Sequence, residues 1–356
     1  MKKQIKFSAF LLLSVLFLSL LTACGGADKG TLVKEPYADR QFLLGTYVQV
    51  KIYDKGKKEV LKPAFELIKK YGREIDVNDA GGSEIDRVNQ AAGVAPVKVD
   101  KDIYRLVKKA YAYSAESDGK FDLAIGPITQ LWHIGFDDAR KPTQQEIDEK
   151  LKLVDYQKVI LNDEEQTVFL QEKGMELDLG AIAKGFITDE VANLLKKKGV
   201  TTAIVDLGGN VYVLGHSPRG DNKPWTVGIQ DPNKARNTVV GYLPGVNQSF
   251  VTSGIYERYL KVDGKSYHHL MNPDTGYPFD NDIAGVTIVS DKSTDGDGLS
   301  TTIFALGLKD GMAFIEKQKG VEALFITKDN KIYETSGIKK TFDLEPDSGY
   351  TMAEEN

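Results

Sequence analysis

The sequence is poor in residues that build disulfide-rich exported proteins and metal clusters. Its 356 residues include one cysteine, Cys24, and four histidines. A single cysteine cannot form a disulfide within the chain or a cysteine-based metal site, and the adjacent His268 and His269 lack the H-x-x-x-H spacing of a helical metal site. No repeat of about 20–50 residues is present, which argues against a repeat protein. The fold must therefore be stabilised by its hydrophobic core alone.

Excess positive charge is also absent. The formal net charge is −5, and removal of residues 1–23 would take away Lys2, Lys3 and Lys6 but no acidic residue, which changes it to −8. Nucleic acid is therefore not an expected partner. With 41% hydrophobic and 27% charged residues, the composition is that of a globular protein.

The N-terminus has the pattern of a secretory signal. "MKKQIKF" supplies three lysines, residues 8–21 are almost wholly apolar, and "LTAC" ends at Cys24. This order predicts a signal peptide of residues 1–23 that ends in a lipobox, with Cys24 as the lipidated residue. A retained transmembrane anchor is the alternative, because residues 7–27 carry no charge and are long enough to span a bilayer.

Lipidation at Cys24 would hold the protein on a membrane surface, so we expect a lipid-anchored protein on the extracytoplasmic face of the cell membrane. "GGADKGTLVKEPYA" (25–38) is typical of a flexible tether. We assign residues 24–39 to the lipidated cysteine and tether, 40–340 to one domain of two interlocked subdomains, and 341–356 to a C-terminal tail.

Strand-like and helix-like segments come in blocks rather than in strict alternation. Helical periodicity occurs at 59–76, 100–117, 143–154, 183–199 and about 297–318, and strand patterns occur at 41–54, 95–99, 156–171, 201–216, 224–231, 239–246, 248–270, 283–290, 323–329 and 331–337. This order favours an α+β fold with mixed or antiparallel sheets and inserted helices.

Three clusters carry chemistry. "DLGAIAKGFITDE" (178–190) places Asp178, two small residues and Lys184 at the start of a helix, where amides and an ammonium can bind a phosphate. A capped helix with a solvated lysine is the simpler alternative for this motif alone.

"STDGDGLSTTIFALG" (293–307) places Asp295 and Asp297 before a helix, with Thr301 on the same helical face as Asp297. Carboxylate and hydroxyl oxygens suit a hard cation such as Mg²⁺, which also takes phosphate oxygens. The segment lacks the spacing and closing glutamate of an EF-hand, and a helix cap is the other interpretation.

The third cluster gathers Ser253, Tyr256, His268 and His269 beside a Gly/Pro-rich turn. Adjacent histidines on a strand face opposite sides, so one of them can point into a cleft and act as a base. A hydrogen-bonded structural histidine is the alternative.

Seven segments in order resemble the successive blocks of the bacterial ApbE family over about residues 40–340. They are "LLGTYVQV" (43–50), "SEIDRVN" (83–89), "SDGKFDLAIGPITQLWHIGF" (117–136), "LDLGAIAKGFITD" (177–189), "TSGIYERY" (252–259), "HHLMNPDTGYPF" (268–279) and "DGLSTTIFALG" (297–307). The resemblance implies the T-fold-related architecture of that family. It also implies a Mg²⁺-dependent transfer of FMN from FAD to a Ser/Thr hydroxyl of an exported or membrane-bound acceptor protein, with release of AMP.

The resemblance also implies roles for individual residues. The Ala181 carbonyl, Asp297 and Thr301 would bind Mg²⁺, and His269 would be catalytic. The residues that would contact FAD are Leu44, Asn78, Lys120, Phe121, Asp122, Asp178, Lys184 and Met271. A metal and an ammonium at this place would stabilise the charge that builds up when the FAD pyrophosphate is broken.

The chain departs from the family at Asn78, where many relatives have an aromatic residue that stacks on FAD. Loss of that ring keeps open a hydrolase that splits FAD into FMN and AMP. The second alternative is a non-catalytic flavin-binding or solute-binding lipoprotein, for which tethered export and a ligand cleft are common features. Release of free FMN without an acceptor would identify the first, and FAD binding without turnover the second.

Overall fold

The computed structural model describes residues 31–78 and 82–353. The chain divides into two units, Met1–Leu32 and Val33–Asn356. The predicted signal peptide and Cys24 lie outside the described residues, and the second unit is the subject below. Within the described residues, no helix has both the length and the apolar character needed to cross a bilayer.

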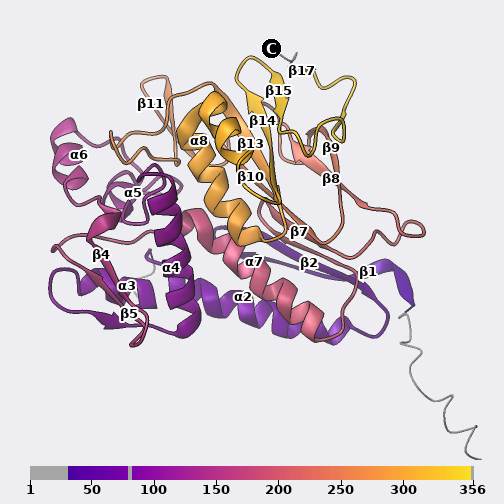
Figure 1. The fold of residues 1–356 in the computed structure, drawn as a ribbon, viewed down its shortest axis with the longest axis horizontal. Helices are drawn as coiled ribbons and strands as arrows, with labels where there is room; N and C mark the ends of the chain where they lie inside the picture. Colours follow the sequence, from indigo (N-terminus) through magenta and orange to yellow (C-terminus); the bar gives the residue numbers. More distant parts are fainter. Residues whose placement is uncertain (1–30, 79–81, 354–356) are drawn as a thin grey trace, which may run out of the picture. The chain divides into compact units, whose positions relative to one another are not determined.

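A nine-stranded sheet forms the centre of the second unit (Figure 1). Its strands lie in the order β1 (Leu32–Leu43), β2 (Thr46–Asp54), β6 (Ala203–Leu207), β7 (Asn210–Leu214), β10 (Gln248–Gly254), β13 (Ile283–Ser290), β14 (Val321–Thr327), β15 (Lys331–Glu334) and β17 (Thr351–Met352). Pairing from β2 to β15 is antiparallel, while β17 runs parallel to β15. All eight residues of β13 are buried, as expected for a central strand covered on both faces.

Helices cover one face of this sheet. α7 (Gly180–Lys197) and α8 (Ser293–Ile315) lie side by side, and α2 (Leu61–Ile75) packs against α7 (Figure 1). α2 buries Leu61, Ala64, Phe65 and Ile68, whose spacing gives one apolar face toward the core. The other helices among the described residues are α3 (Glu84–Gln90), α4 (Lys101–Glu116), α5 (Gly126–Trp132) and α6 (Gln144–Leu151), with single 3₁₀ turns η1 (Lys58–Val60) and η2 (Tyr156–Lys158).

Three small sheets complete the unit. β8 (Trp225–Gln230), β9 (Val239–Gly245) and β16 (Asp343–Leu344) form one of them, and Trp225 and Val227 belong to a second apolar core with Val213 of β7 and Leu324 of β14. The others are β3–β5–β4 (Val97–Lys98, Thr167–Leu170, Val159–Asn162) and the hairpin β11–β12 (Tyr259–Val262, Lys265–His268).

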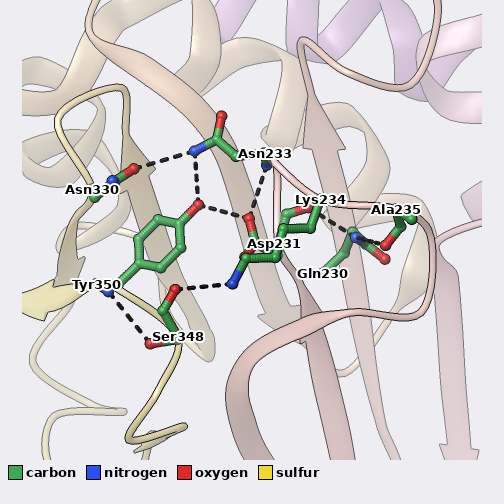
Figure 2. Close-up of polar contacts among 8 residues, drawn as sticks. All are labelled: Gln230, Asp231, Asn233, Lys234, Ala235, Asn330, Ser348 and Tyr350. Atoms are coloured by element: carbon green, nitrogen blue, oxygen red, sulfur yellow. Dashed lines mark hydrogen bonds and ion pairs between the residues drawn. The ribbon is translucent and has the colours of Figure 1, made fainter.

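The C-terminal segment is fixed to the β8–β9 connection by a polar cluster around Asp231 (Figure 2). Asp231 is fully buried, and its Oδ1 accepts hydrogen bonds from the Asn233 amide and the Tyr350 hydroxyl, both at 2.8 Å. Lys234 Nζ lies 3.3 Å from the other carboxylate oxygen and donates to the Ser348 carbonyl at 3.1 Å. We call these five residues the Asp231 cluster.

The α+β prediction is confirmed, and so are the helices expected at 59–76, 100–117 and 143–154. Three local predictions need correction. Residues 41–54 form a hairpin rather than one strand, because Leu44 and Gly45 adopt positive φ and turn the chain between β1 and β2. α8 begins at Ser293, so Asp295 and Asp297 lie within the helix and not before it. Residues 32–38, which composition assigned to a flexible tether, belong to β1.

Candidate active site

One cleft of about 1310 Å³ opens between the β1–β2 turn, α2, α5, α7, α8 and the segment 252–273. All twelve site residues expected from the resemblance line it: Leu44, Asn78, Lys120, Phe121, Asp122, Asp178, Ala181, Lys184, His269, Met271, Asp297 and Thr301. Their positions are spread over about 260 residues of sequence, so the fold brings them together.

Asp297 is the most deeply buried acid of the cleft, with 3% of its surface exposed. Its Oδ2 accepts a hydrogen bond from the Gly185 amide (2.8 Å), and Lys184 Nζ lies 3.7 Å from Oδ1. Burial raises the pKa of Asp297, and Lys184 opposes that shift. The Asn210 side chain is close enough to lower the pKa as well, but its amide nitrogen makes no hydrogen bond. The negative charge of the carboxylate is therefore stabilised by one neutral hydrogen-bond donor, the Gly185 amide, and by one more distant cation, Lys184.

Gly185 is required by the crossing of α7 and α8. A Cβ at this position would lie 2.2 Å from the Ser293 carbonyl oxygen and 2.7 Å from the Asp297 Cβ. The absence of a side chain brings the two helices into contact, and this contact places the Gly185 amide on Asp297. The Lys-Gly pair thus combines a cation with a close helix crossing.

Ala181 lies in the first turn of α7, and Thr301 follows Asp297 by four residues on α8. One carboxylate, one hydroxyl and one backbone carbonyl therefore line the same cleft, and all are hard oxygen donors. No group of three His, Cys, Asp or Glu side chains suited to a metal occurs in the described part of the chain. A divalent ion held here would rely on Asp297, neutral oxygens and phosphate oxygens.

Asp178 caps the start of α7. Its Oδ1 accepts from the Gly180 amide (2.8 Å), while its Oδ2 accepts from the Thr129 hydroxyl of α5 (2.7 Å). The side chain therefore fixes α5 against the first turn of α7, which contains Ala181.

His269 follows β12 and faces the cleft, while His268 turns to the core and bonds the Phe279 carbonyl at 2.8 Å. Burial, Arg258 and Lys184 together lower the pKa of His269 to about 3, so the imidazole is neutral at pH 7. Its Nδ1 lies 3.3 Å from the Arg258 carbonyl. A carbonyl only accepts, so Nδ1 carries the hydrogen and Nε2 keeps a free lone pair.

The three residues of the "KFD" segment have different environments. Lys120 pairs with Asp274 and lines the cleft, whereas Phe121 is 3% exposed and packs edge-on against Tyr113. Asp122 accepts from the amides of Ala124 (2.7 Å) and Tyr156 (3.1 Å), and burial raises its pKa to about 6. Asp122 therefore braces the cleft wall through backbone amides.

Asn78 lies against α5 and the residue that follows it. Its side-chain oxygen accepts from Gln130 Nε2 (3.0 Å) and lies 3.2 Å from His133 Nε2. The His133 ring stacks on Phe136 with 4.0 Å between ring centroids. Both rings line the cleft, so aromatic surface is present beside the position where Asn78 supplies none.

Other residues noted in the sequence have different surroundings. Asp295 is bound by the Tyr113 hydroxyl (2.7 Å) and Lys109 (3.1 Å), away from the cleft. Ser253 lines the cleft and its hydroxyl lies 2.8 Å from that of Ser300. Tyr256 borders a smaller neighbouring cavity of about 260 Å³, and its hydroxyl is buried without a hydrogen bond.

Sequence reasoning missed Thr129, Thr46 and Arg258. Thr46 has a buried hydroxyl in the cleft wall, and no described residue forms a hydrogen bond with it. Arg258 supplies the carbonyl that orients His269. Both lie inside the segments "LLGT" and "YERY", but no spacing rule marks such residues as site residues.

Comparison with known proteins gives one consistent answer. The sequence profile of the ApbE family matches residues 44–325. An FAD:protein FMN transferase of Klebsiella pneumoniae is 40% identical over 316 residues, which is 89% of this chain and 96% of that protein. One from Treponema pallidum is 36% identical over 331 residues, covering 89% and 90%. A crystal structure of an ApbE protein from Thermotoga maritima superposes with a TM-score of 0.79 at 30% identity, over 86% of this chain and 99% of that one.

Proposed function

This chain belongs to the ApbE family, and we propose that it is an FAD:protein FMN transferase that moves FMN from FAD to a Ser/Thr hydroxyl and releases AMP. One observation carries the proposal: a single cleft combines hard oxygen donors, a lysine and a neutral histidine with a free lone pair. These are the groups that a phosphoryl transfer from a dinucleotide to a hydroxyl requires.

We propose that the Ala181 carbonyl, Asp297 and Thr301 hold Mg²⁺. The buried Asp297 carboxylate fits this role, because its raised pKa and distant lysine leave its charge incompletely balanced. A Mg²⁺ ion bound there would neutralise charge on the diphosphate oxygens of FAD. Lys184 would assist from the same side of the cleft, and Asp178 keeps the α5–α7 wall in place around them.

His269 is the proposed base. The acceptor hydroxyl gives its proton to Nε2 of His269 while its oxygen bonds to the phosphorus on the FMN side of the diphosphate. The bond between this phosphorus and the bridging oxygen breaks, and the electron pair leaves with AMP. Binding of the anionic diphosphate would offset the two cations that lower the pKa of His269, so the base becomes stronger when substrate is present.

Placement in the cell follows from the N-terminus. We propose that signal cleavage and lipidation at Cys24 anchor the protein to the extracytoplasmic face of the cell membrane, where its acceptor is an exported or membrane-bound protein.

FAD hydrolysis is the second candidate. It stays open because Asn78 lines the cleft where the family resemblance leads us to expect an aromatic ring. Water in place of the acceptor hydroxyl would give free FMN and AMP.

The decisive experiment incubates residues 25–356 with FAD and Mg²⁺, with and without an exported flavoprotein that carries a Ser/Thr acceptor site. AMP, free FMN and acceptor mass are followed together. Gain of one FMN by the acceptor, lost with chelator and in Asp297→Ala, supports the transferase. Free FMN with an unmodified acceptor makes the protein a pyrophosphatase, and absence of AMP leaves only flavin binding.

A further inference from the structure

Arg258 joins three parts of the cleft wall. Its carbonyl accepts from the His269 amide (3.2 Å) and faces His269 Nδ1. Its guanidinium donates a long hydrogen bond of 3.5 Å to the Leu44 carbonyl in the β1–β2 turn. The same residue therefore orients the proposed base and extends a cation along the wall that contains Leu44.

Two glycines enclose the Arg258 side chain. A Cβ at Gly45 would lie 2.7 Å from the guanidinium nitrogen Nη2, and one at Gly135 would lie 2.9 Å from Cδ. Both glycines have positive φ, 68° and 101°. Two loops distant in sequence thus leave a slot of the width of an arginine side chain, which holds the guanidinium in one place.

The charge of Arg258 has no carboxylate partner within ion-pair distance among the described residues. Four other cations of the cleft have an acidic neighbour: Arg87 (Glu84), Lys120 (Asp274), Lys184 (Asp297) and Arg236 (Glu257). Lys69 and Arg73 of α2 also line the cleft without such a neighbour among the described residues, but only Arg258 contacts His269 through its carbonyl. A guanidinium has five N–H donors, and with the described residues this one makes a single long hydrogen bond. The remaining donors and the uncompensated charge suit an anion in the cleft.

We propose that the Arg258 guanidinium binds the phosphoryl group that is transferred, in the cleft that Lys184 and His269 also line. This inference rests on the proposed function for the identity of the anion. Lys184, Arg258 and His269 line the same cleft, and both cations lower the pKa of His269. An arginine there holds equatorial phosphoryl oxygens while His269 takes the proton of the attacking hydroxyl.

The first test measures FMN transfer and flavin binding in Arg258→Gln and Arg258→Lys. We expect Arg258→Gln to lower kcat about 100-fold, with partial recovery in Arg258→Lys, because one preorganised donor to a developing charge is removed. The preference for FMN over riboflavin, measured as a ratio of Kd values with Mg²⁺ present, should fall about tenfold. Arg40→Gln is the matched control, since Arg40 is exposed on β1 outside the cleft and lies over the Tyr47 ring.

The second test uses chemical rescue. Arg258→Ala empties the slot between Gly45 and Gly135. Addition of about 20–50 mM guanidinium should therefore raise the transfer rate of this variant at least tenfold, whereas urea, which is neutral and of similar shape, should not. Equal concentrations of NaCl control for ionic strength. If the variant were merely misfolded, guanidinium would not restore its activity selectively over urea. Rescue by guanidinium alone therefore excludes misfolding as the cause of the lost activity.

The inference is overturned if the FMN-to-riboflavin ratio of Arg258→Gln equals that of the unaltered protein, or if guanidinium and urea act alike. The ratio does not require transfer. A protein that binds FMN through Arg258 but modifies no acceptor would disprove the proposed function and leave this inference standing.

Discussion

Two buried aspartates of this protein each have a lysine nearby, but they differ in their hydrogen bonds and in their access to the cleft. Asp231 is fully buried with Lys234 Nζ at 3.3 Å, and Asp297 is 3% exposed with Lys184 Nζ at 3.7 Å. Asp231 also accepts two short hydrogen bonds, one of them from the distant Tyr350, and its lysine is shared with the Ser348 carbonyl. Asp297 accepts one hydrogen bond, from the Gly185 amide, and lines the cleft.

The difference separates a structural ion pair from a binding site. The Asp231 cluster is closed to solvent and joins the C-terminal segment to the β8–β9 connection (Figure 2): Oδ1 accepts two hydrogen bonds, while Oδ2 has the ion pair with Lys234 and no hydrogen bond among the described residues. Asp297 is open on the cleft side, and its charge is left for a ligand to balance. Substitution of the first should therefore change stability, and substitution of the second should change activity.

The largest expected effect is on activity. Asp297→Asn keeps the shape of the side chain but removes the charge, and we expect kcat/KM for FMN transfer to fall about a thousandfold at saturating Mg²⁺. Without metal, the melting temperature should stay equal or rise, because a buried carboxylate with a raised pKa no longer has to be charged.

Addition of Mg²⁺ gives the control for this variant. The melting temperature of the unaltered protein should rise with Mg²⁺ concentration through binding to the folded state, and that of Asp297→Asn should not. An equal Mg²⁺ response in both proteins would place the metal elsewhere.

The next effect is on stability. Asp231→Ala removes the acceptor for Tyr350 and Asn233 and leaves these donors without a partner, so we expect the free energy of unfolding to fall by about 3 kcal/mol. Urea denaturation followed by circular dichroism measures this, and kcat/KM at 25 °C should remain within about twofold. A large loss of activity in folded Asp231→Ala would remove the contrast between the two sites.

Tyr350→Phe is a milder test of the same cluster. It removes one hydroxyl that donates to Asp231 and accepts from Asn233 at 2.9 Å, and should lower the free energy of unfolding by about 1–2 kcal/mol. Tyr277→Phe is the matched control, because the Tyr277 hydroxyl bonds Gln144 on the exposed surface. The control should change stability by less than about 0.5 kcal/mol.

The smallest effect is a change in pH dependence at the cleft. His269 has a pKa of about 3 in the folded protein against 6.5 in the unfolded chain, so only the unfolded chain takes up this proton between those values. Its contribution to stability is complete above pH 6.5 and is lost as the pH falls toward 3. In His269→Gln the free energy of unfolding should depend less steeply on pH between 3 and 6.5. The unfolding reaction should take up fewer protons, by up to about one, than in the unaltered protein. An identical slope in both proteins would show that His269 titrates normally.

The sequence was sufficient for the α+β class because the patterns behind it are long. β13 is mostly apolar, with six of its eight residues Ile, Ala, Gly or Val, and α2 and α4 repeat their apolar residues at helical spacing. Ordered motifs sufficed to select twelve residues that line one cleft, since each motif keeps its own short spacing whatever the fold does between them; the roles of these residues stay predictions.

Local backbone exceptions and tertiary contacts were not predictable. Leu44 turns the chain with a φ of 56°, a conformation that leucine rarely adopts, so the propensities of 41–54 pointed to one strand. The N-terminal residues of α8 include Gly296 and Gly298, which weaken the helical pattern on both sides of Asp297. Arg258 acquires its importance from Gly45 and Gly135, 213 and 123 residues earlier in the chain, and no local pattern connects them.

The tight crossing at Gly185 also affects how natural variation in this family should be interpreted. A methyl group there would overlap the Ser293 carbonyl, so mutation at this position is expected to be removed by selection even when every reacting group is intact. Gly45 and Gly135 are constrained in the same way by the arginine between them. Sequence conservation in this cleft is therefore expected at three glycines that take no part in the chemistry. For the neighbouring residues Lys184, Leu44 and Ile134, a role in binding or catalysis has to be judged from their contacts and not from invariance alone.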